Sequence, residues 1–402
     1  MEDEKGTPLI DESKIINVFL LDCTIKGKSS GVMRFIDNMF ASMKQISGIR
    51  PHLIRIVLHS HMLAFARVQP DQFIIETDMR LPILEEEEFI WKNIAPMFAG
   101  KQNIVFDLNL IDLIGLGNFL KRRTNGKLVS HLHCIPWHLF YENNKAKFFT
   151  LLKKPIGREH YYNIAEQHFY MTADKIIAVA DSGANFIRQI SGIKPIVVKN
   201  GIEDVMEEWT GSIPTDNIVV ISVGGSDRRK GMEYNIEAAW KALRRGVNIK
   251  MLIAGAMPEK WQTEMREKFS GLDVTFGNYS MQELFEQYQS ADLGLISSIT
   301  EQTSYCAMEM MMFGLPIIAP DVKAFKEMEM KECALFVPVS RDNDRLKPDT
   351  NKMAEYIEEL SNNKGLYKKM SIAARESYLE HYQSARMVNE TIDVYRKLLK
   401  MD

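Results

Sequence analysis

The chain has 402 residues, a length typical of two domains, and its 46% hydrophobic and 26% charged residues are ordinary for a globular protein. A formal net charge of −3 excludes a strongly basic nucleic-acid-binding protein, so we expect no nucleic-acid partner. Four widely separated cysteines exclude a disulfide framework, and a polar, acidic N-terminus without any apolar run of about 18 residues predicts a cytoplasmic protein.

Short β-rich runs alternate with longer amphipathic runs, as in parallel sheets whose strands are joined by crossover helices. In the first half the predicted strands are Ile16–Asp22, Ile54–Ser60, Gln72–Glu76, Ile104–Leu108, Lys127–Cys134, Lys175–Ala180 and Pro195–Lys199. In the second half they are Asn217–Val223, Ile249–Ala254, Asp273–Phe276, Leu293–Ser297, Pro316–Ala319 and Ala334–Val337. We therefore expect an α/β fold with two Rossmann-like domains, at residues 1–203 and 204–380, followed by a last segment at 381–402.

Helices are clearest in the second half. Met232, Ile236 and Ala239 recur at helical spacing, which predicts a helix over 231–245 with one buried face. Ser280 and Glu283 form a capping box, the sequence signature of a helix N-terminus. Roughly the last fifty residues are helical by periodicity.

Two features of the first half follow predicted strands. Ser30-Gly31 comes after the first strand, and His131 and His133 stand near the end of the strand Lys127–Cys134. A pair of histidines on one face can hold a metal, but no further residues with zinc spacing follow.

The segment VVISVGGSDRRKG, residues 219–231, is a candidate phosphate-binding loop. A buried strand ends in Gly224-Gly225, and the turn before the next helix carries Arg228, Arg229 and Lys230. Glycines let a ligand approach the backbone, and cations at the start of a helix favour a bound diphosphate. Taken alone, the same pattern also describes an ordinary basic loop on the surface.

The segment ITEQTSYCAMEMMMFGLPIIAP, residues 299–320, is the most informative part of the chain. Glu301 lies before a predicted helix that Thr303 or Ser304 caps, and Glu309 follows eight residues later inside that helix. Backbone N–H groups at this N-terminus can meet a phosphate while the two carboxylates accept from sugar hydroxyls. The sequence therefore predicts a nucleotide-sugar site.

Together the two segments resemble retaining glycosyltransferases of the GT-B fold, family 4 type. The Glu301–Glu309 spacing matches the Glu-x7-Glu signature of that family, and Gly224 with Lys230-Gly231 matches its Gly-Arg…Lys-Gly loop. Gly225 departs from the family by replacing the usual arginine, and either Arg228 or Arg229 is then expected to supply the second positive charge at the diphosphate. The residues after Glu301 resemble a bacterial subgroup with Glu-Gln-x-Ser-Tyr at this point. The resemblance covers roughly residues 170–380 well and the first half more loosely.

The resemblance implies a GT-B architecture, with two parallel-sheet domains facing a cleft and a C-terminal helix crossing back to the first domain. It implies that Lys230 neutralises the donor diphosphate, that Glu309 accepts from the ribose and that Glu301 contacts the transferred sugar. Other residues expected at the donor are Gly31, His133, Gly225, Arg229, Thr303 and Ser304. We expect no cofactor beyond the donor, most simply a UDP-sugar, and an acceptor that is a saccharide, a lipid-linked glycan or a protein.

A metal is not expected, because the one match to an Asp-x-Asp metal motif, Asp342-Asn343-Asp344, falls in a polar loop. The stretch from Trp137 to Tyr162 mixes aromatic and basic residues, which fits either a peripheral membrane contact or an ordinary surface helix and loop. The oligomeric state is open.

Two other functions remain as alternatives. The first is a non-catalytic GT-B subunit that binds an acceptor or a partner glycosyltransferase, which Gly225 supports and Lys230, Glu301 and Glu309 oppose. The second is another GT-B enzyme, such as a nucleotide-sugar epimerase. Such enzymes lack this combination of Glu-x7-Glu and Lys-Gly.

Overall fold

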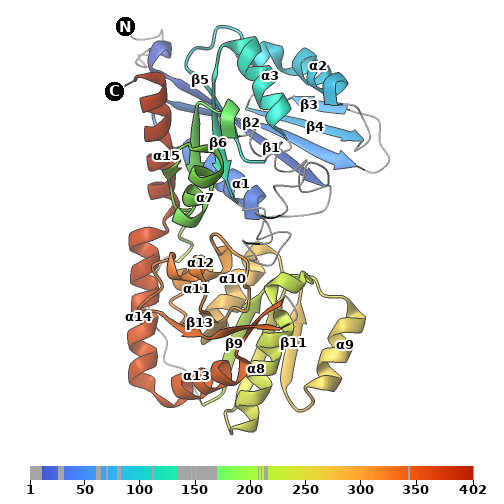
Figure 1. Ribbon diagram of the computed structural model, residues 1–402, viewed down its shortest axis with the longest axis vertical. Helices are drawn as coiled ribbons and strands as arrows, with labels where there is room; N and C mark the ends of the chain where they lie inside the picture. Colours follow the sequence, from blue (N-terminus) through green and yellow to red (C-terminus); the bar gives the residue numbers. More distant parts are fainter. Residues whose placement is uncertain are drawn as a thin grey trace. The chain divides into compact units, whose positions relative to one another are not determined.

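The computed structural model describes residues 11–25, 31–59, 65–68, 71–78, 83–110, 113–133, 146, 150, 170–206, 208–209, 211, 216–342 and 345–401. The chain divides into two compact units (Figure 1). The first consists of Met1–His133, Thr150–Asn200 and Ser384–Asp402, and the second of Cys134–Phe149 and Gly201–Gln383. The chain joins the second unit directly after Asn200, because Ile202 N–H donates to Tyr382 O and Ile202 pairs with Gln383.

The first unit is built on an eight-stranded sheet with the strand order β3-β4-β2-β1-β5-β6-β7-β8. The strands are β1 Ile16–Ile25, β2 Ile49–His59, β3 Phe65–Val68, β4 Gln72–Asp78, β5 Ile104–Leu108, β6 Lys127–Leu132, β7 Lys175–Ala178 and β8 Ile196–Val197. All neighbours are parallel except β3 and β4, which are antiparallel. The sequence analysis predicted no strand at β3, whose pairing with β4 makes this edge antiparallel. The connection between β3 and β4 is too short for the crossover that parallel strands need.

Helices cover both faces of this sheet. They are α1 Gly31–Met43, α2 Ile83–Ile94, α3 Ile114–Thr124, α7 Asp181–Ser191 and α15 Ser384–Leu399, with the 3₁₀ turns η1 Glu12–Lys14 and η2 Ala95–Phe98. The residues Val18, Phe19, Leu20 and Leu21 of β1 are all fully buried, as expected for a strand covered on both faces. The C-terminal helix α15 packs on α1, so the two ends of the sequence share one core (Figure 1).

The second unit contains a six-stranded, all-parallel sheet with the order β11-β10-β9-β12-β13-β14. Its strands are β9 Ile218–Val223, β10 Ile249–Ala254, β11 Asp273–Gly277, β12 Leu293–Leu295, β13 Ile317–Pro320 and β14 Ala334–Val337, and an antiparallel hairpin follows, β15 Val339–Asp342 with β16 Arg345–Pro348. Its helices are η4 Arg228–Lys230, α8 Met232–Arg244, α9 Glu259–Lys268, α10 Met281–Ser290, α11 Tyr305–Met312, α12 Lys323–Lys326, α13 Thr350–Asn362 and α14 Lys364–His381.

Two separate cores lie on the two faces of this sheet. One packs α8, α9 and α13 against the strands, and the other packs α10, α11, α12 and α14. Helix α11 is apolar except for Glu309, and every residue from Ala307 to Met312 is buried. The chain leaves β9 toward α8 on one face and β12 toward α11 on the other. The neighbouring strands β9 and β12 therefore form a topological switch point, where ligands bind in open α/β sheets.

The predicted helices of the second half are present. The capping box is confirmed: Ser280 N–H donates to Glu283 Oε2 at 2.7 Å, and Glu283 N–H donates to Ser280 Oγ at 3.4 Å. The C-terminal helical run is divided into α13, α14 and α15, with breaks near Asn363 and Tyr382.

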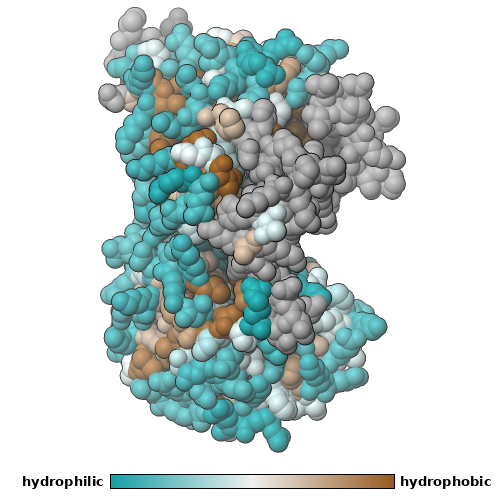
Figure 2. Space-filling view, viewed as in Figure 1, coloured by the Kyte–Doolittle hydropathy of each residue, from teal (hydrophilic) through white to brown (hydrophobic). Residues whose placement is uncertain are grey.

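The described surface in Figure 2 is mainly hydrophilic, with small apolar patches. Its exposed large hydrophobic side chains are scattered: Met171, Ile196, Val205, Met281, Ile372 and Leu379. Across the described residues, no helix combines the length and apolarity that a membrane span requires.

Candidate functional site

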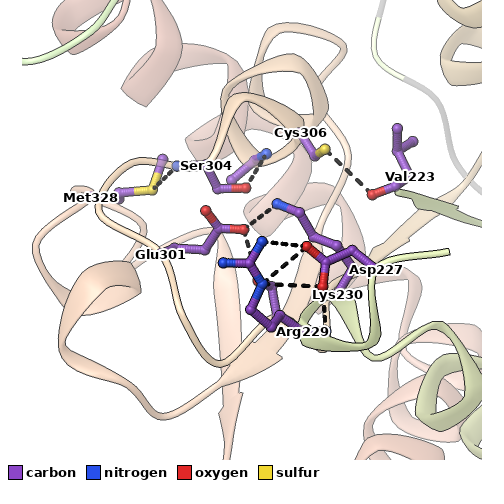
Figure 3. Close-up of polar contacts among 10 residues, drawn as sticks. Val223, Asp227, Arg229, Lys230, Glu301, Ser304, Cys306 and Met328 are labelled. Carbon is purple, nitrogen blue, oxygen red and sulfur yellow. Dashed lines mark hydrogen bonds and ion pairs between the residues drawn. The ribbon is translucent and has the colours of Figure 1, made fainter. Parts of the chain in front are cut away.

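The loops after β9 and β12 meet at the switch point of the second sheet and bring together Lys230 and Glu301. Lys230 Nζ lies 2.5 Å from Glu301 Oε1 (Figure 3). Ser298 Oγ donates to the same carboxylate oxygen at 2.7 Å. The side chain of Lys230 is 35% exposed and that of Glu301 is 12% exposed. Burial acts to lower the pKa of Lys230, but the Glu301 carboxylate, together with Cys306 and Asp227, more than offsets this effect and the pKa is raised. Lys230 is therefore a persistent cation that a ligand can reach.

Gly231 allows this approach of the two loops. Its φ of +65° lies in the left-handed region, and a Cβ there would come within 2.7 Å of Ser297 Cβ and 2.8 Å of Ser297 O. Both the conformation and the contact require glycine. Gly225 is different, because a Cβ at this position would meet only Ala256 O, at 3.8 Å. The loop thus has room for a side chain at the position where the resembling family has arginine.

The two arginines of η4 differ in their partners. Arg229 is bound to Asp227, with Nη2 at 2.5 Å from Oδ2 and Nε at 3.0 Å (Figure 3). The hydrogen bonds from Arg229 lower the pKa of Asp227, so the charge of Arg229 is balanced locally. Arg228 is exposed and has no ion pair with any residue that the structure describes. Both arginines line a cavity of about 390 Å³ with Tyr234, Met257 and Trp261.

A buried polar bridge lies beneath the two loops. Asn235 of α8 is fully buried, donates from Nδ2 to Ser222 Oγ at 2.6 Å and accepts at Oδ1 from Ser297 Oγ at 2.5 Å. The bridge ties α8 to β9 and to the loop that carries Glu301. Sequence reasoning missed Asn235, although a polar residue on the apolar face of a helix was a visible signal.

Helix α11 carries the second carboxylate. Ser304 is its N-cap, as predicted, and its Oγ accepts from Ala307 N–H at 3.3 Å. Glu309 is buried, and Tyr288 Oη of α10 donates to its Oε2 at 2.8 Å. The sequence predicted the start of helix α10 at Ser280 but not this hydrogen bond.

The backbone N–H of Ser304, expected at the donor phosphate, lies 3.4 Å from Met328 Sδ, which is a weak acceptor (Figure 3). Cys306 Sγ lies 3.4 Å from Val223 O at the end of β9. Thr303 is partly buried next to the cap. The start of α11 therefore lies beside the carboxyl end of β9, close to Lys230 and Glu301.

The first unit has its own polar cluster at the carboxyl ends of β5 and β6. Asp107 Oδ1 lies 2.8 Å from His131 Nδ1 and accepts from Asn109 Nδ2 at 2.9 Å. Tyr395 of α15 donates to Asp107 Oδ2. His133 Nε2 lies 2.9 Å from Asn109 Oδ1. Gly31 is the first residue of α1. The roles expected of Gly31 and His133 stay predictions.

Some predicted features lie outside the described residues: Ser30, nearly all of the stretch from Trp137 to Tyr162 and most of Asp342-Asn343-Asp344. Within the described ranges, no group of three or more His, Cys, Asp or Glu side chains is arranged to hold a metal ion.

Comparison with known proteins supports one fold. The solved structure of a sucrose-phosphate synthase from Thermosynechococcus elongatus superimposes with a TM-score of 0.72 at 16% identity, covering 96% of this chain and all of that one. The pneumococcal O-GlcNAc transferase GtfA, solved in complex with UDP and GlcNAc, gives 0.68 at 9% identity over 96% and 99% of the two chains. The fold is GT-B.

The GT-B chain also matches a protein family and curated sequences. Residues 217–363 match the family described as "Glycosyl transferases group 1". The α-D-kanosaminyltransferase of Streptomyces kanamyceticus is 27% identical over 187 residues, which cover 46% of each chain. The chain spans about half the length of the curated relatives it matches. The family match at residues 217–363 includes Asn235 and all the described site residues of the second unit.

Proposed function

We propose that the protein is a retaining, metal-independent glycosyltransferase that moves a sugar from a nucleotide-sugar, most simply a UDP-sugar, to a saccharide, lipid-linked glycan or protein. The observation that carries this proposal is the Lys230–Glu301 ion pair at the switch point, beside the N-terminus of α11. A cation next to a helix N-terminus is an arrangement that binds phosphate. The known enzymes of similar fold and sequence support the same class of reaction.

Lys230 binds the donor diphosphate in this proposal. In the structure, the Glu301 carboxylate holds the Lys230 ammonium in place, and Ser298 donates a hydrogen bond to that carboxylate. A diphosphate carries more negative charge than one carboxylate and therefore competes for the same cation. When Lys230 turns to the phosphates, the Glu301 carboxylate becomes available to hydroxyls of the transferred sugar. The ion pair thus keeps both groups placed before the donor arrives.

Glu309 is assigned to the ribose hydroxyls. The hydrogen bond from Tyr288 fixes the orientation of its side chain, and a carboxylate accepts up to about four hydrogen bonds. The backbone around Thr303 and Ser304 is assigned to the phosphates. With Arg229 bound to Asp227, we assign the second phosphate contact to Arg228 in addition to the predicted Arg229.

Retention follows in this proposal from attack on the same face as the leaving group. The acceptor hydroxyl bonds to the anomeric carbon as the bond to the diphosphate breaks, and the departing phosphate takes the hydroxyl proton. Lys230 and the start of α11 stabilise the charge that develops on the leaving group. No metal ion is required for this step.

The test is donor hydrolysis by the purified protein across UDP-, GDP- and ADP-sugars, with EDTA present. Release of one nucleoside diphosphate by the wild type and not by Lys230→Gln supports the proposal and identifies the donor. Lys260→Gln is the matched control, because Lys260 is 90% exposed and has only a 4.0 Å contact with Glu264.

The alternative is a non-catalytic GT-B subunit. Gly225 and the neutralised Arg229 favour it, since both reduce the positive charge expected at a diphosphate. A thermal shift with UDP separates the two functions, because a degenerate site gives no stabilisation. Absence of both turnover and UDP binding would replace the transferase proposal with this one.

A further inference from the structure

A continuous chain of hydrogen bonds in the first unit runs from the C-terminal helix to His133. Tyr395 donates to Asp107, Asp107 accepts from Asn109, and Asn109 Oδ1 lies 2.9 Å from His133 Nε2. Asp107, Asn109 and Tyr395 are at most 3% exposed. This chain of hydrogen bonds ends at His133, directly after β6 and at the last residue of the described segment 113–133.

The chemistry of each group orders the hydrogens along this chain. A carboxylate only accepts, so Asn109 must turn its NH₂ group toward Asp107 and its carbonyl oxygen toward His133. An amide oxygen also only accepts, so His133 Nε2 must carry a hydrogen. A neutral imidazole with a hydrogen on Nε2 has a lone pair on Nδ1.

The surroundings keep this imidazole neutral. Burial lowers the pKa of His133 well below its ordinary value, and the neighbouring His131 lowers it further. The ring packs edge-on against Phe35, with 4.6 Å between ring centroids, and lies stacked on His131 at 5.8 Å. Burial and the Asp107 carboxylate raise the pKa of Tyr395 well above its ordinary value, so its hydroxyl keeps the proton that it donates to Asp107.

We propose that Asp107 and Asn109 are positioning residues that fix His133 as the Nε2–H tautomer, so that Nδ1 accepts a hydrogen bond from a saccharide hydroxyl. The role of the hydroxyl rests on the proposed function, whereas the tautomer does not. Tyr395 extends the same network to α15, so the C-terminal helix takes part in setting the state of a histidine at the sheet edge.

The tautomer is measured directly by long-range ¹H–¹⁵N correlation spectra of protein labelled at its nine histidines, with the signals of His133 identified by their loss in His133→Gln. We expect a protonated Nε2 and an unprotonated Nδ1 between pH 6 and 8. A protonated Nδ1, or a charged ring in this range, would overturn the proposal.

The role of Asn109 is tested by Asn109→Leu and Asn109→Asp, with the exposed Asn185→Leu as the matched control. Asn109→Leu removes the acceptor at Nε2, and we expect the ring to populate both tautomers. Asn109→Asp places a carboxylate there, which should raise the pKa of His133, and the control should change neither. An unchanged tautomer and titration in both Asn109 variants would overturn the positioning role. If these variants do not fold, the wild-type spectrum still decides the tautomer.

Activity then tests the saccharide hydroxyl. We expect Asn109→Leu to lower kcat about tenfold, the usual effect of misplacing one hydrogen bond, with little change in KM for the donor. A loss already seen in donor hydrolysis assigns the hydroxyl to the donor sugar, and a loss only in transfer assigns it to the acceptor. Unchanged kcat in both assays would overturn the hydroxyl role. An inactive wild type with the expected tautomer would remove the proposed function while the assignment of His133 stands.

Discussion

The two polar clusters of this protein differ in charge and exposure. In the second unit, Lys230 and Glu301 form a partly exposed ion pair at the ends of β9 and β12. In the first unit, Asp107 is fully buried and surrounded by groups that share its charge through hydrogen bonds, from Tyr395, Asn109 and His131. A partly exposed ion pair can exchange a partner for a ligand at lower cost than a buried network can rearrange. The Lys230–Glu301 pair therefore suits a site where a charged ligand binds and leaves. The network around Asp107 suits the fixed orientation of the His133 ring.

The largest expected effect is a loss of activity when Lys230 is replaced. We expect Lys230→Gln to lower kcat/KM for the donor by about 100- to 1,000-fold, because the leaving diphosphate loses its main counter-charge. Initial rates of donor hydrolysis measure this loss, and Lys260→Gln should retain wild-type rates. Wild-type rates in Lys230→Gln would show that the ion pair is structural.

A buried, uncharged histidine in the first unit, His52, predicts that the stability of the folded protein depends on pH. His52 of β2 is buried and stacked on Phe19, and neither ring nitrogen has a hydrogen-bond partner among the described residues. Burial, with smaller effects from Lys101 and Arg50, lowers its pKa from 6.5 to about 4. Between these values the unfolded chain binds a proton that the folded chain does not, so stability falls as the pH drops from 6.5 toward 4, by at most about 3 kcal/mol.

We expect His52→Phe, which keeps the stack on Phe19, to remove most of this pH dependence. Hydrogen exchange of the β1 and β2 amides at pH 7 and pH 4.5 measures it, with the surface variant His381→Gln as control. Equal acid sensitivity in wild type and His52→Phe would assign the effect to other groups.

A smaller loss of stability is expected from the buried Asn235 bridge that lies beneath the Lys230–Glu301 pair. Asn235→Leu leaves the hydroxyls of Ser222 and Ser297 without their buried partner, which should destabilise the second unit by about 2 kcal/mol. It should also lower kcat/KM, because Ser297 belongs to the loop that presents Glu301. Urea unfolding measures the first effect, and the exposed Asn351→Leu is the control. Unchanged stability and kinetics would show that the bridge does not hold the loop.

The smallest expected effect is tighter binding of UDP when a cation is added to the loop after β9. Gly225→Arg adds a cation where the loop has room, and we expect UDP to bind several-fold more tightly, by about 1 kcal/mol. Gly225→Gln is the matched control, since it adds a long polar side chain without charge. Titration calorimetry at low and high salt measures the difference, which should shrink at high salt. Equal binding by the two variants would place the diphosphate away from Gly225.

Much of the fold could be predicted from local patterns. The alternation of β-rich and amphipathic runs predicted two Rossmann-like units, and Ser280 with Glu283 predicted the start of α10 through hydrogen bonds that span only three residues. The edge hairpin β3–β4 was missed, because its short strand has little pattern of its own and depends on pairing with β4. The expected domain boundary at 203 and the unit boundary after Asn200 differ because Ile202 pairs with Gln383, far away in the sequence.

The candidate site was predictable where a residue type served one local purpose. Gly231, Lys230 and Glu301 stand out because a helix start and a cation suit a phosphate, and a carboxylate suits sugar hydroxyls, so that together they suggest a nucleotide-sugar ligand. The balance of charge among them was not predictable. Asp227 binds Arg229, Glu301 binds Lys230, and Arg228 is left with no described ion pair, an outcome decided by side-chain geometry within a few ångströms.

The sequence by itself determined the α/β class, the helix caps, the glycines of the turn and the identity of the charged residues at the switch point, because these depend on backbone preferences over a few neighbouring positions. Only the tertiary structure decided which distant groups meet. Tyr395 reaches Asp107 across 288 positions, Asn235 joins Ser222 to Ser297, and Tyr288 orients Glu309. Buried polar groups must find partners wherever packing brings elements together, and that requirement acts in space rather than along the chain.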